Sequence, residues 1–351
     1  MAGGGTGGHI IPALAVAQEL RRHGHEPFFI GTQRGMEAKL VPAAGFPIEW
    51  IEIGGLNRVG LAQRIKSLGQ LPGSTVQAMR IMRRRKPRAV FSMGGYVAGP
   101  VMMAAALMRI PIVVMEPNAI PGFTNRRLAR VVARALVNFP ETARYFPAAE
   151  VTGMPVREDF FKLPSREPMQ NGRFTLLITG GSQGSKRLND AARESWKRFA
   201  EARLPLRIIH QTGSAMQREL QQQFQHTGLN GEVTAFLDNM PSAFASADLV
   251  VCRSGASTVS ELAAAGKASV LVPFPFAADD HQLRNAEAMT GIGGARMVLD
   301  KEMTGVRLFF EVSELAESPA TLRQMSEQAR ALAKPGAARR AVEVLEQLAM
   351  R

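Results

Sequence analysis

The chain has 351 residues, 46% of them hydrophobic, which is enough for two globular domains with complete cores. A single cysteine excludes a disulfide framework and a thiolate metal cluster, and the longest uncharged apolar run, Val97–Met108, is too short to span a bilayer. No signal peptide precedes the first motif, so we expect a protein of the reducing cytoplasm.

The net charge of +13 is concentrated in the first half of the chain. Residues 1–155 contain 19 Lys and Arg against 8 Asp and Glu, whereas residues 156–351 contain 24 against 22. The segment Ile53–Met115 holds ten of the basic residues and no acidic one. A nucleic acid and an anionic membrane surface are the two expected kinds of partner, and a merely solvated basic face is the third interpretation.

The first motif is a glycine-rich loop, Met1–His9, followed by a predicted amphipathic helix over Ile10–Arg22 with Pro12 in its first turn. Glycines let a diphosphate or a sugar approach backbone N–H groups closely. Three of them also fit the G-x-G-x-x-G pattern of a nicotinamide-dependent dehydrogenase, although no strand precedes the pattern. His9 begins the helix, where a histidine is either a cap or surface residue or a catalytic base.

The basic segment follows two predicted strands, Pro27–Ile30 and Phe46–Gly54, and the helix Arg34–Ala44 that separates them. Within it, apolar residues recur at helical spacing on both sides of a break at Pro72-Gly73, and Arg or Lys residues alternate with them over Arg64–Arg88. Such a stripe is either a core face or, with this charge, a surface that enters a lipid interface.

Strands and helices then alternate, which predicts a parallel, doubly wound sheet. The strand Ala89–Met93 leads into a second glycine loop, Gly94-Gly95-Tyr96, and the strand Ile112–Met115 leads into Glu116-Pro117-Asn118. Two further strands, Ala135–Phe139 and Val151–Thr152, precede the expected hinge at Gly153–Arg157.

The second half repeats this pattern, beginning with the strand Phe174–Thr179 and the loop Gly180–Ser185. That loop is not a phosphate-binding Walker A loop, because the spacing G-x-x-x-x-G-K is absent. The remaining elements are strands that we expect at residues 206–210, 233–237, 248–252, 269–273 and 295–299, and helices from Ser313 onward that break at Pro335-Gly336. Two nucleotide-type folds facing each other across a cleft are therefore expected.

The most informative stretch of the second half is Cys252–Ala286. A turn at Arg253-Ser254-Gly255 follows a strand, and a helix is expected to begin near Ser257, where unpaired N–H groups favour an anion. Glu261, one turn into that helix, suits the hydroxyls of a ribose, whereas Thr258 and Glu261 together also fit a capping box without a ligand. A second strand-to-helix turn carries Asp279-Asp280-His281-Gln282 and then Asn285, so both turns are expected at the carboxyl edge of one sheet.

Eight motifs together resemble the MurG family, the peripheral membrane N-acetylglucosaminyltransferases of peptidoglycan synthesis. They run in the family's order over nearly the whole chain: GGGTGGH with Pro12, GTQRGMEAKLV (Gly31–Val41), GGL (Gly54–Leu56), SMGGYVAGP (Ser92–Pro100), EPNAIPGFTN (Glu116–Asn125), GMPVR (Gly153–Arg157), GGSQGS (Gly180–Ser185) and CRSGASTVSE (Cys252–Glu261).

The resemblance implies an α/β glycosyltransferase fold of the B type, with two Rossmann-like domains. Residues 1–154 would bind the acceptor and the membrane, the last helix from about residue 330 would pack back on them, and residues 155–329 would bind the UDP-sugar. The implied enzyme is an inverting hexosyltransferase of cell wall synthesis at the cytoplasmic face of the membrane. Its partners would be UDP-N-acetylglucosamine, undecaprenyl-diphosphate-linked muramyl pentapeptide and an anionic membrane surface, with no nucleic acid. No cofactor or metal would be required, although a divalent cation could assist weakly.

The resemblance also implies the site residues. The catalytic candidates are His9 and Glu116. The uracil would lie against the backbone near Phe236 and Leu237, the ribose on Glu261 and the sugar hydroxyls on Gln282 and Asn118. The implied donor-binding set is Thr6, Gly7, Gly8, Asn118, Arg157, Ser182, Leu237, Ala256, Ser257, Thr258, Val259, Ser260, Glu261 and Gln282. The loops that would hold the acceptor diphosphate contribute Gly5, Gly94, Gly95 and Tyr96.

One departure from the family pattern concerns the first glycine loop. The family has an apolar strand leading into it, and here Met1 and Ala2 stand in that place. The rival interpretations are a UDP-sugar 2-epimerase of the same fold, a dehydrogenase, and a basic nucleic-acid-binding protein, for which no reading module is recognisable.

Overall fold

The structure, a computed structural model, describes residues 1–4, 7–54, 61–164, 167–169, 172–181, 183–277 and 280–350, with only the backbone described over 61–68. The chain divides into two compact units. Unit 1 consists of Met1–Arg157 and Lys334–Arg351, and unit 2 consists of Glu158–Ala333. These bounds lie within four residues of the domain boundaries expected from the sequence.

Unit 1 is built on parallel strands. One sheet has the order β3-β4-β5-β6, and β1 pairs with β2 beside it. Ala2 joins the two groups, because it forms parallel bridges to Ile30 of β1 and to Ser92 of β3. The strands are β1 (Phe29–Gly31), β2 (Ile48–Trp50), β3 (Val90–Ser92), β4 (Ile112–Glu116), β5 (Arg134–Val137) and β6 (Ala149–Val151).

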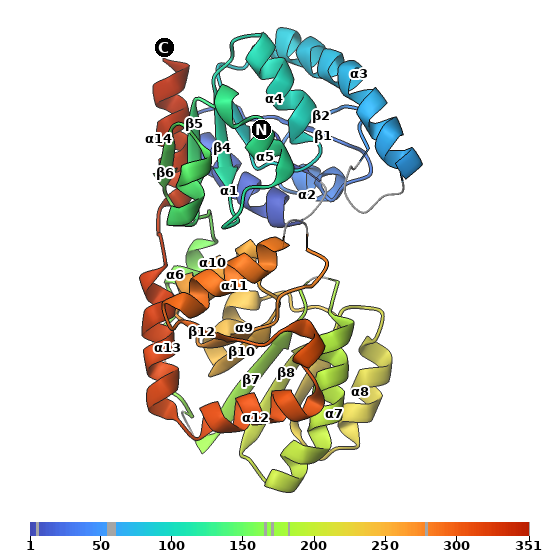
Figure 1. The fold of residues 1–351 in the computed structure, drawn as a ribbon, viewed down its shortest axis with the longest axis vertical. Coiled ribbons are helices and arrows are strands. Elements are labelled where there is room, and N and C mark those ends of the chain that lie inside the picture. Colours follow the sequence, from blue (N-terminus) through green and yellow to red (C-terminus); the bar gives the residue numbers. More distant parts are fainter. Residues whose placement is uncertain are drawn as a thin grey trace. The chain divides into compact units, whose positions relative to one another are not determined.

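Side chains of the unit 1 strands alternate between two apolar layers, as the period of two in a strand requires. Phe91 and Val113 pack with helices α1 and α14 on one face, whereas Val90 and Val114 pack with α3 and α4 on the other. Figure 1 shows these helices on the two sides of the sheet. The helices of unit 1 are α1 (Gly7–Arg22), α2 (Glu37–Ala43), α3 (Leu61–Arg85), α4 (Ala98–Leu107), α5 (Phe123–Arg127) and α14 (Ala337–Ala349), with short 3-10 turns at Ala129–Val131 and Pro140–Tyr145.

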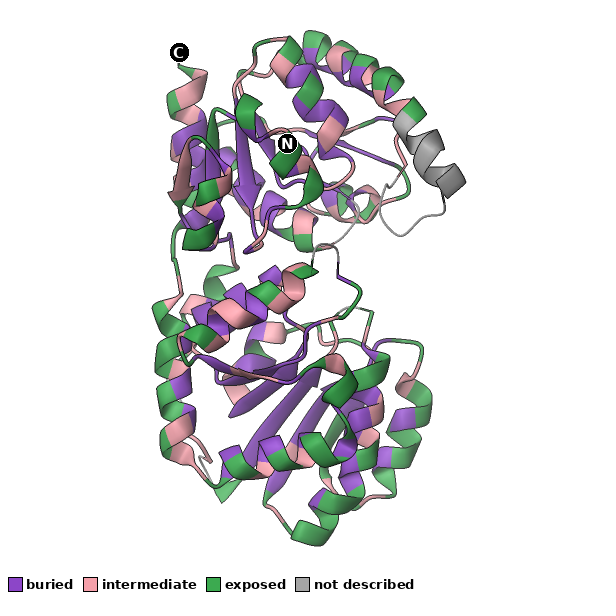
Figure 2. Cartoon of the chain, in the orientation of Figure 1, coloured by how far each residue is buried: buried purple, intermediate pink, exposed green. Residues whose placement is uncertain are grey.

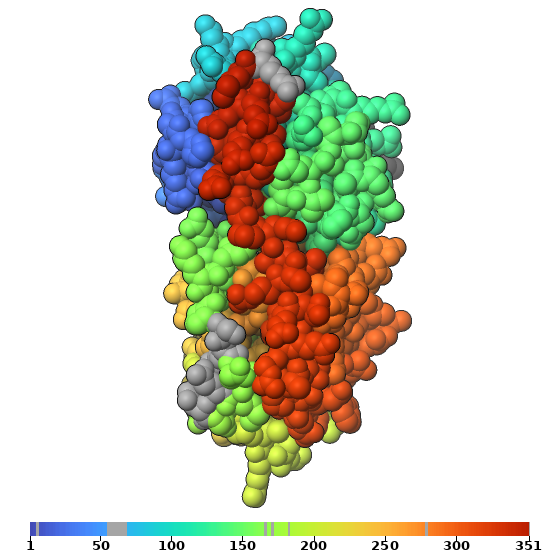
Figure 3. Space-filling model, turned by 90° about the vertical axis from the view of Figure 1, so that its left-hand side faces the viewer, coloured from blue at the N-terminus to red at the C-terminus, as the bar shows by residue number. Residues whose placement is uncertain are grey.

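The C-terminal helix α14 belongs to unit 1 although the chain reaches it through unit 2. Its buried residues Ala341, Val342 and Leu345 pack in the same cluster as Ile10 and Val16 of α1. In Figure 3 this helix lies between the N-terminal segment and the segment that carries β6. Arg340 fixes that position with a two-point ion pair to Glu150 of β6, at 2.6 and 3.1 Å.

Unit 2 contains one parallel sheet of six strands with the order β12-β11-β10-β7-β8-β9. The chain starts at the central strand β7, adds β8 and β9 on one side, and then returns to add β10, β11 and β12 on the other. This doubly wound order creates a switch point between β7 and β10. The strands are β7 (Phe174–Thr179), β8 (Leu206–Gln211), β9 (Asn230–Thr234), β10 (Leu249–Cys252), β11 (Ser269–Leu271) and β12 (Ala295–Met297).

The inner strands of the unit 2 sheet, β7, β8, β10 and β11, are buried, whereas the edge strand β9 exposes residues 230–232, and the helices around the sheet turn their polar faces outward (Figure 2). Trp196 of α7, Phe224 of α8 and Val312 of α12 share one apolar cluster with Leu176 and Ile178 of β7. The helices of unit 2 are α6 (Glu158–Phe161), α7 (Lys186–Ala202), α8 (Gln217–Gln225), α9 (Met240–Ser246), α10 (Ala256–Ala265), α11 (His281–Gly291), α12 (Gly305–Ala316) and α13 (Pro319–Ala331), with a 3-10 turn at Asp300–Glu302. Among the described residues, no helix is long and apolar enough to cross a membrane.

The expected fold class is confirmed, and several local predictions are wrong. Helix α1 begins at Gly7 rather than Ile10, so His9 lies inside its first turn and Pro12 in its second. Helix α3 continues through Pro72: Ser74 and Thr75 donate hydrogen bonds to the Gln70 and Leu71 carbonyls one turn earlier, and Ala78, Ile81 and Met82 pack in one apolar cluster with α4. Strand β9 ends at Thr234, three residues before the expected end at Leu237, since the chain turns there and Thr234 Oγ1 bonds the Phe236 carbonyl.

The pair between Arg340 and Glu150 predicts a pH-dependent contribution to stability. Hydrogen bonds from Arg340 lower the pKa of the Glu150 carboxyl. A carboxyl whose pKa is lower in the folded than in the unfolded protein stabilises the fold at pH values above the ordinary carboxyl pKa. That stabilisation is lost as the pH falls through the lowered pKa. Replacing Arg340 with Gln should therefore cost about 0.5–1 kcal/mol of unfolding free energy at pH 7, measured by denaturant titration, and less below pH 4.

Arg339→Gln is the matched control, because Arg339 is exposed and pairs only at the surface with Glu343 on its own helix. Equal losses in the two variants, or a loss at Arg340 that does not shrink in acid, would contradict this role.

Candidate functional site

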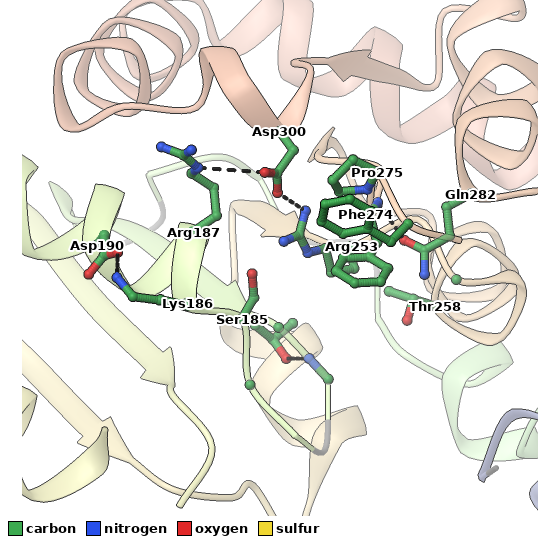
Figure 4. A pocket seen from close by; sticks show the side chains of 16 residues that line it. Ser185, Lys186, Arg187, Asp190, Arg253, Thr258, Phe274, Pro275, Gln282 and Asp300 are labelled. Atoms are coloured by element: carbon green, nitrogen blue, oxygen red, sulfur yellow. Dashed lines mark hydrogen bonds and ion pairs between the residues drawn. The ribbon is translucent and has the colours of Figure 1, made fainter. Parts of the chain in front are cut away.

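A cavity of about 770 Å³ lies at the switch point of unit 2. The loops that follow β7 and β10 line it, together with residues from the loop after β11 and from the 3-10 turn after β12 (Figure 4). Its described lining is Thr179, Gly180, Gly181, Gly184, Ser185, Lys186, Arg187, Asp190, Arg253, Gly255, Thr258, Phe274, Pro275, Phe276, Gln282 and Asp300. Ligands of open α/β sheets bind at this edge, outside the carboxyl ends of the strands.

Helix α10 presents its N-terminus to this cavity. Its N-cap is Gly255, which has no side chain to cap the helix, and Ala256 is the first helical residue. The capping-box interpretation of Thr258 is therefore wrong, since Thr258 lies inside the first turn and lines the cavity. The unpaired N–H groups of this turn and the helix dipole favour an anion.

The other predicted donor-binding residues of α10, at positions 259–261, are buried or half-buried. Val259 and Ser260 are buried, so a ligand would reach only their backbone. Glu261 is half-buried one turn into the helix. Burial, together with the nearby Glu261 carboxylate, raises the pKa of the Cys252 thiol, which fits the expected inert, buried cysteine.

Arg253 clamps three segments at the cavity. Its guanidinium donates to the carbonyls of Val272 and Pro273, at 3.1 and 3.3 Å, and pairs with Asp300 at 2.6 Å. It also lies over the Phe274 ring, 5.4 Å from the centroid. Arg187 approaches Asp300 from the other side, as Figure 4 shows. This clamp holds the loop after β11 in place beside the loop after β10.

Two further bonds join the loop after β10 to helix α11. Ser254 Oγ donates to the Gln282 carbonyl at 2.8 Å, and Asn285 Nδ2 donates to the Ser254 carbonyl at 3.2 Å. The side-chain oxygen of Gln282 accepts the Phe274 N–H at 3.0 Å. The Gln282 amide is therefore held in one orientation, with its oxygen directed to the protein.

The glycine loop after β7 needs glycine for steric reasons. Gly184 has φ of +72°, and a Cβ there would meet the Thr212 carbonyl oxygen at 1.9 Å. Gly181 N–H donates to Thr179 Oγ1, and Ser185 caps helix α7 through the N–H of Leu188. The backbone of this loop therefore comes closer to the neighbouring strand than any side chain would allow.

In unit 1 the two predicted glycine loops meet at the carboxyl edge of the sheet. A Cβ on Gly95 would lie 2.9 Å from the Gly4 carbonyl oxygen and 3.4 Å from His9 Nδ1. The His9 ring therefore packs over the second glycine loop. Thr124 Oγ1 donates to the Gly95 carbonyl at 3.2 Å, so the start of α5, directly after the loop that follows β4, joins the same group.

Glu116, at the end of β4, anchors that third loop. One carboxylate oxygen accepts the N–H and Nδ2 of Asn118, and the other accepts the N–H of Gly122 and Nδ2 of Asn125, at 2.8–3.1 Å. The side chain is 1% exposed, and burial raises the pKa of its carboxyl. Four donors occupy the four lone-pair positions of the carboxylate.

The predicted site residues thus fall into two groups. His9, Gly94, Gly95, Tyr96, Glu116 and Asn118 lie at one edge of unit 1, with Gly7 and Gly8 in the first turn of α1. Thr258 and Gln282 line the unit 2 cavity with the start of α10, whereas Leu237 follows β9 and is not among its lining residues. Arg157 is the last residue of unit 1 before α6. Gly5, Thr6 and Ser182 lie outside the described residues.

Sequence reasoning missed several residues of the cavity: Lys186, Arg187, Phe274 and Asp300, and the clamping role of Arg253. Two signals could have indicated them. Phe274-Pro275-Phe276 is an aromatic segment directly after a strand, and Asp300 follows the last strand of the sheet. No group of three or more His, Cys, Asp or Glu side chains suited to a metal ion occurs in the described part of the chain.

Comparisons with known proteins agree with this two-unit geometry. Residues 1–137 match the glycosyltransferase family 28 N-terminal domain, and residues 175–341 match the glycosyltransferase family 28 C-terminal domain. The chain is 58% identical to the UDP-N-acetylglucosamine–N-acetylmuramyl-(pentapeptide) pyrophosphoryl-undecaprenol N-acetylglucosamine transferase of Solibacter usitatus, over 99% of this chain and 95% of that protein. The crystal structure of Acinetobacter baumannii MurG matches with a TM-score of 0.85 and 36% identity, over 99% of this chain and 98% of that one.

The chain belongs to the MurG family of glycosyltransferases. A UDP-N-acetylglucosamine 2-epimerase from Neisseria meningitidis also shares the fold, with a TM-score of 0.69 over 98% of each chain, but its identity is 14% and the likeness extends to the fold alone. Membership of the MurG family therefore rests on sequence identity over nearly the whole chain. The epimerase has the same fold but lacks that identity.

In this MurG family member, the four bonds to Glu116 predict a specific sensitivity. Glu116→Gln would turn an NH₂ group toward two N–H donors whichever way the amide is oriented. We expect a loss of about 1–3 kcal/mol of unfolding free energy, measured by denaturant titration. Glu141→Gln, an exposed change in the neighbouring 3-10 turn, should be neutral. Unchanged stability of the Glu116 variant would show that the loop is not anchored in this way.

Proposed function

We propose that this protein transfers N-acetylglucosamine from UDP-N-acetylglucosamine to the 4-hydroxyl of undecaprenyl-diphosphate-linked N-acetylmuramyl pentapeptide, a step of peptidoglycan synthesis. The observation that carries the proposal is the 58% identity to a transferase of that name over 99% of the chain. A cavity at the switch point of unit 2, and three loops that meet at the edge of unit 1, support it.

The donor binds unit 2. The diphosphate lies against the first turn of α10 and the glycine loop after β7, where backbone N–H groups stabilise negative charge as UDP leaves. Glu261 accepts hydrogen bonds from the ribose hydroxyls, and the uracil lies near Phe236 and Leu237. Gln282 contacts the sugar through its amide nitrogen, because its oxygen is bonded to the Phe274 N–H.

The acceptor binds unit 1, and His9 is the base. As the acceptor 4-oxygen attacks the anomeric carbon, its proton passes to the His9 imidazole, and the bond from that carbon to the UDP oxygen breaks on the opposite face. This displacement gives a β-linkage with inversion. Glu116 is the weaker candidate for the base, because its four lone-pair positions are already occupied by protein donors. Its role is to hold Asn118 and the loop after β4.

The protein binds the cytoplasmic face of the membrane through α3 and α4 of unit 1. Exposed apolar side chains, Val76 on α3 and Met103 and Leu107 on α4, lie on two helices that pack together. Arg80 and Arg83 are exposed on α3 close by in sequence. Apolar side chains flanked by guanidinium groups suit an interface with anionic lipid.

Two variants should separate the proposed roles in an assay of disaccharide formation from UDP-N-acetylglucosamine and the lipid-linked acceptor. Glu261→Ala should weaken UDP binding by about 1–3 kcal/mol in calorimetry, the value of a hydrogen bond to a charged group.

His9→Gln should keep UDP affinity but lose about a hundredfold or more in turnover, together with the acidic limb of the pH profile.

Each variant is the control for the other. Formation of N-acetylmannosamine without disaccharide would favour the epimerase reaction instead. Retained turnover in His9→Gln would remove it as the base, and unchanged UDP affinity in Glu261→Ala would remove the ribose contact.

The proposed membrane surface predicts flotation with vesicles that contain anionic lipid, and release by salt because the attraction is screened. Arg80→Glu combined with Arg83→Glu should reduce flotation, whereas the same change at exposed Arg198 and Arg218 of unit 2 should not. Equal binding to neutral and anionic vesicles, or tighter binding to RNA, would contradict the assignment.

A further inference from the structure

Glu37 is a buried carboxylate that none of the steps above uses. It is fully buried in the first turn of α2, behind the glycine loops of unit 1. One carboxylate oxygen accepts the Thr32 N–H at 3.1 Å and the Thr32 hydroxyl at 2.8 Å. The Thr32 hydroxyl in turn lies 3.0 Å from the Tyr96 hydroxyl, in the second glycine loop.

The direction of this chain of hydrogen bonds follows from the number of protons. The Thr32 hydroxyl has one proton, and it donates that proton to the Glu37 carboxylate. Its oxygen must then accept from Tyr96, so the phenol proton points into the protein. Burial, with the nearby Glu37 carboxylate, raises the pKa of the Tyr96 phenol, so the phenol keeps the proton that it donates.

Three glycines form the walls around the carboxylate. A Cβ on Gly4 would lie 2.7 Å from a Glu37 oxygen, one on Gly35 would lie 2.0 Å from the other oxygen, and one on Gly31 would lie 2.8 Å from Glu37 Cγ. Glu37 therefore touches the first glycine loop directly and reaches the second loop through Thr32. The two loops also meet at Gly4 and Gly95.

We propose that Glu37 is a positioning residue for the lipid-linked acceptor, which, through Thr32, holds Tyr96 and the Gly94–Tyr96 loop against the first glycine loop. This assignment rests on the proposed function, in which both loops bind the acceptor. A buried carboxylate would repel a diphosphate at direct contact, so its role is to hold the loops rather than to bind the ligand. With Tyr96 held in this way, the N–H groups of the Gly94–Tyr96 loop serve the phosphate oxygens of the acceptor.

Thr32 is the residue at which to test the link, because Thr32→Val removes the hydroxyl while keeping the shape. The KM for the lipid-linked acceptor should rise about tenfold, with kcat and the KM for UDP-N-acetylglucosamine unchanged within twofold. Thr32→Ser should restore the acceptor KM, since it keeps the hydroxyl. Tyr96→Phe should match Thr32→Val, and the double variant should be no worse than either, because both remove the same link.

Hydrogen exchange gives a readout that does not depend on activity. Backbone amides of Gly94–Tyr96 should exchange faster in Thr32→Val than in the unaltered protein. Thr75→Val, which removes another buried hydroxyl of unit 1 that bonds the Leu71 carbonyl, should leave the loop unchanged.

The outcomes are distinguishable. Absence of disaccharide from the unaltered protein would contradict the proposed function, whereas normal exchange of the loop in Thr32→Val would overturn the positioning role whatever the activity. If Thr32→Val lowered kcat and thermal stability without raising the acceptor KM, the role of Thr32 and Glu37 would be purely structural. Multiplying effects in the double variant would show that Tyr96 does not act through Thr32.

Discussion

Close approach of backbone to backbone at the carboxyl edge of each sheet is the constraint on which the glycine loops of both units depend. In unit 2, Gly184 lies so near the Thr212 carbonyl that no side chain would fit, and in unit 1 Gly95 stands in the same relation to Gly4. Both glycines have positive φ values, which other residues adopt only with strain. The loops can therefore direct N–H groups outward at the switch point, where a parallel doubly wound sheet leaves room for a ligand.

The two units stabilise their loops by different electrostatic means. In unit 2 a cation does so: Arg253 binds two carbonyls and Asp300, and so joins the loops after β10, β11 and β12. In unit 1 two buried carboxylates, Glu37 and Glu116, accept hydrogen bonds from the loops around them. Buried charges of this kind persist only when donors satisfy them, so they specify one loop conformation.

The fold by itself does not select the reaction. An epimerase shares the two-unit architecture over nearly the whole chain at 14% identity, whereas a transferase of the MurG family is 58% identical over 99% of the chain. Function in such folds is carried by side chains at loop positions, which change without altering the sheets.

The sequence by itself determined the fold class, the family and most of the loops, because apolar strands, glycine loops and helix starts are local patterns. It identified Glu261 and the glycine loops as candidates, but it did not decide between a capping box and a ligand contact at Thr258. The tertiary structure excluded the capping box, since the helix begins at Ala256. It also decided the start of α1 at Gly7 and the continuation of α3 through Pro72, because tertiary contacts overrode local propensity. The roles of Arg253, Glu37 and Glu116 likewise required the fold, since each depends on which carbonyls and N–H groups other segments bring within reach.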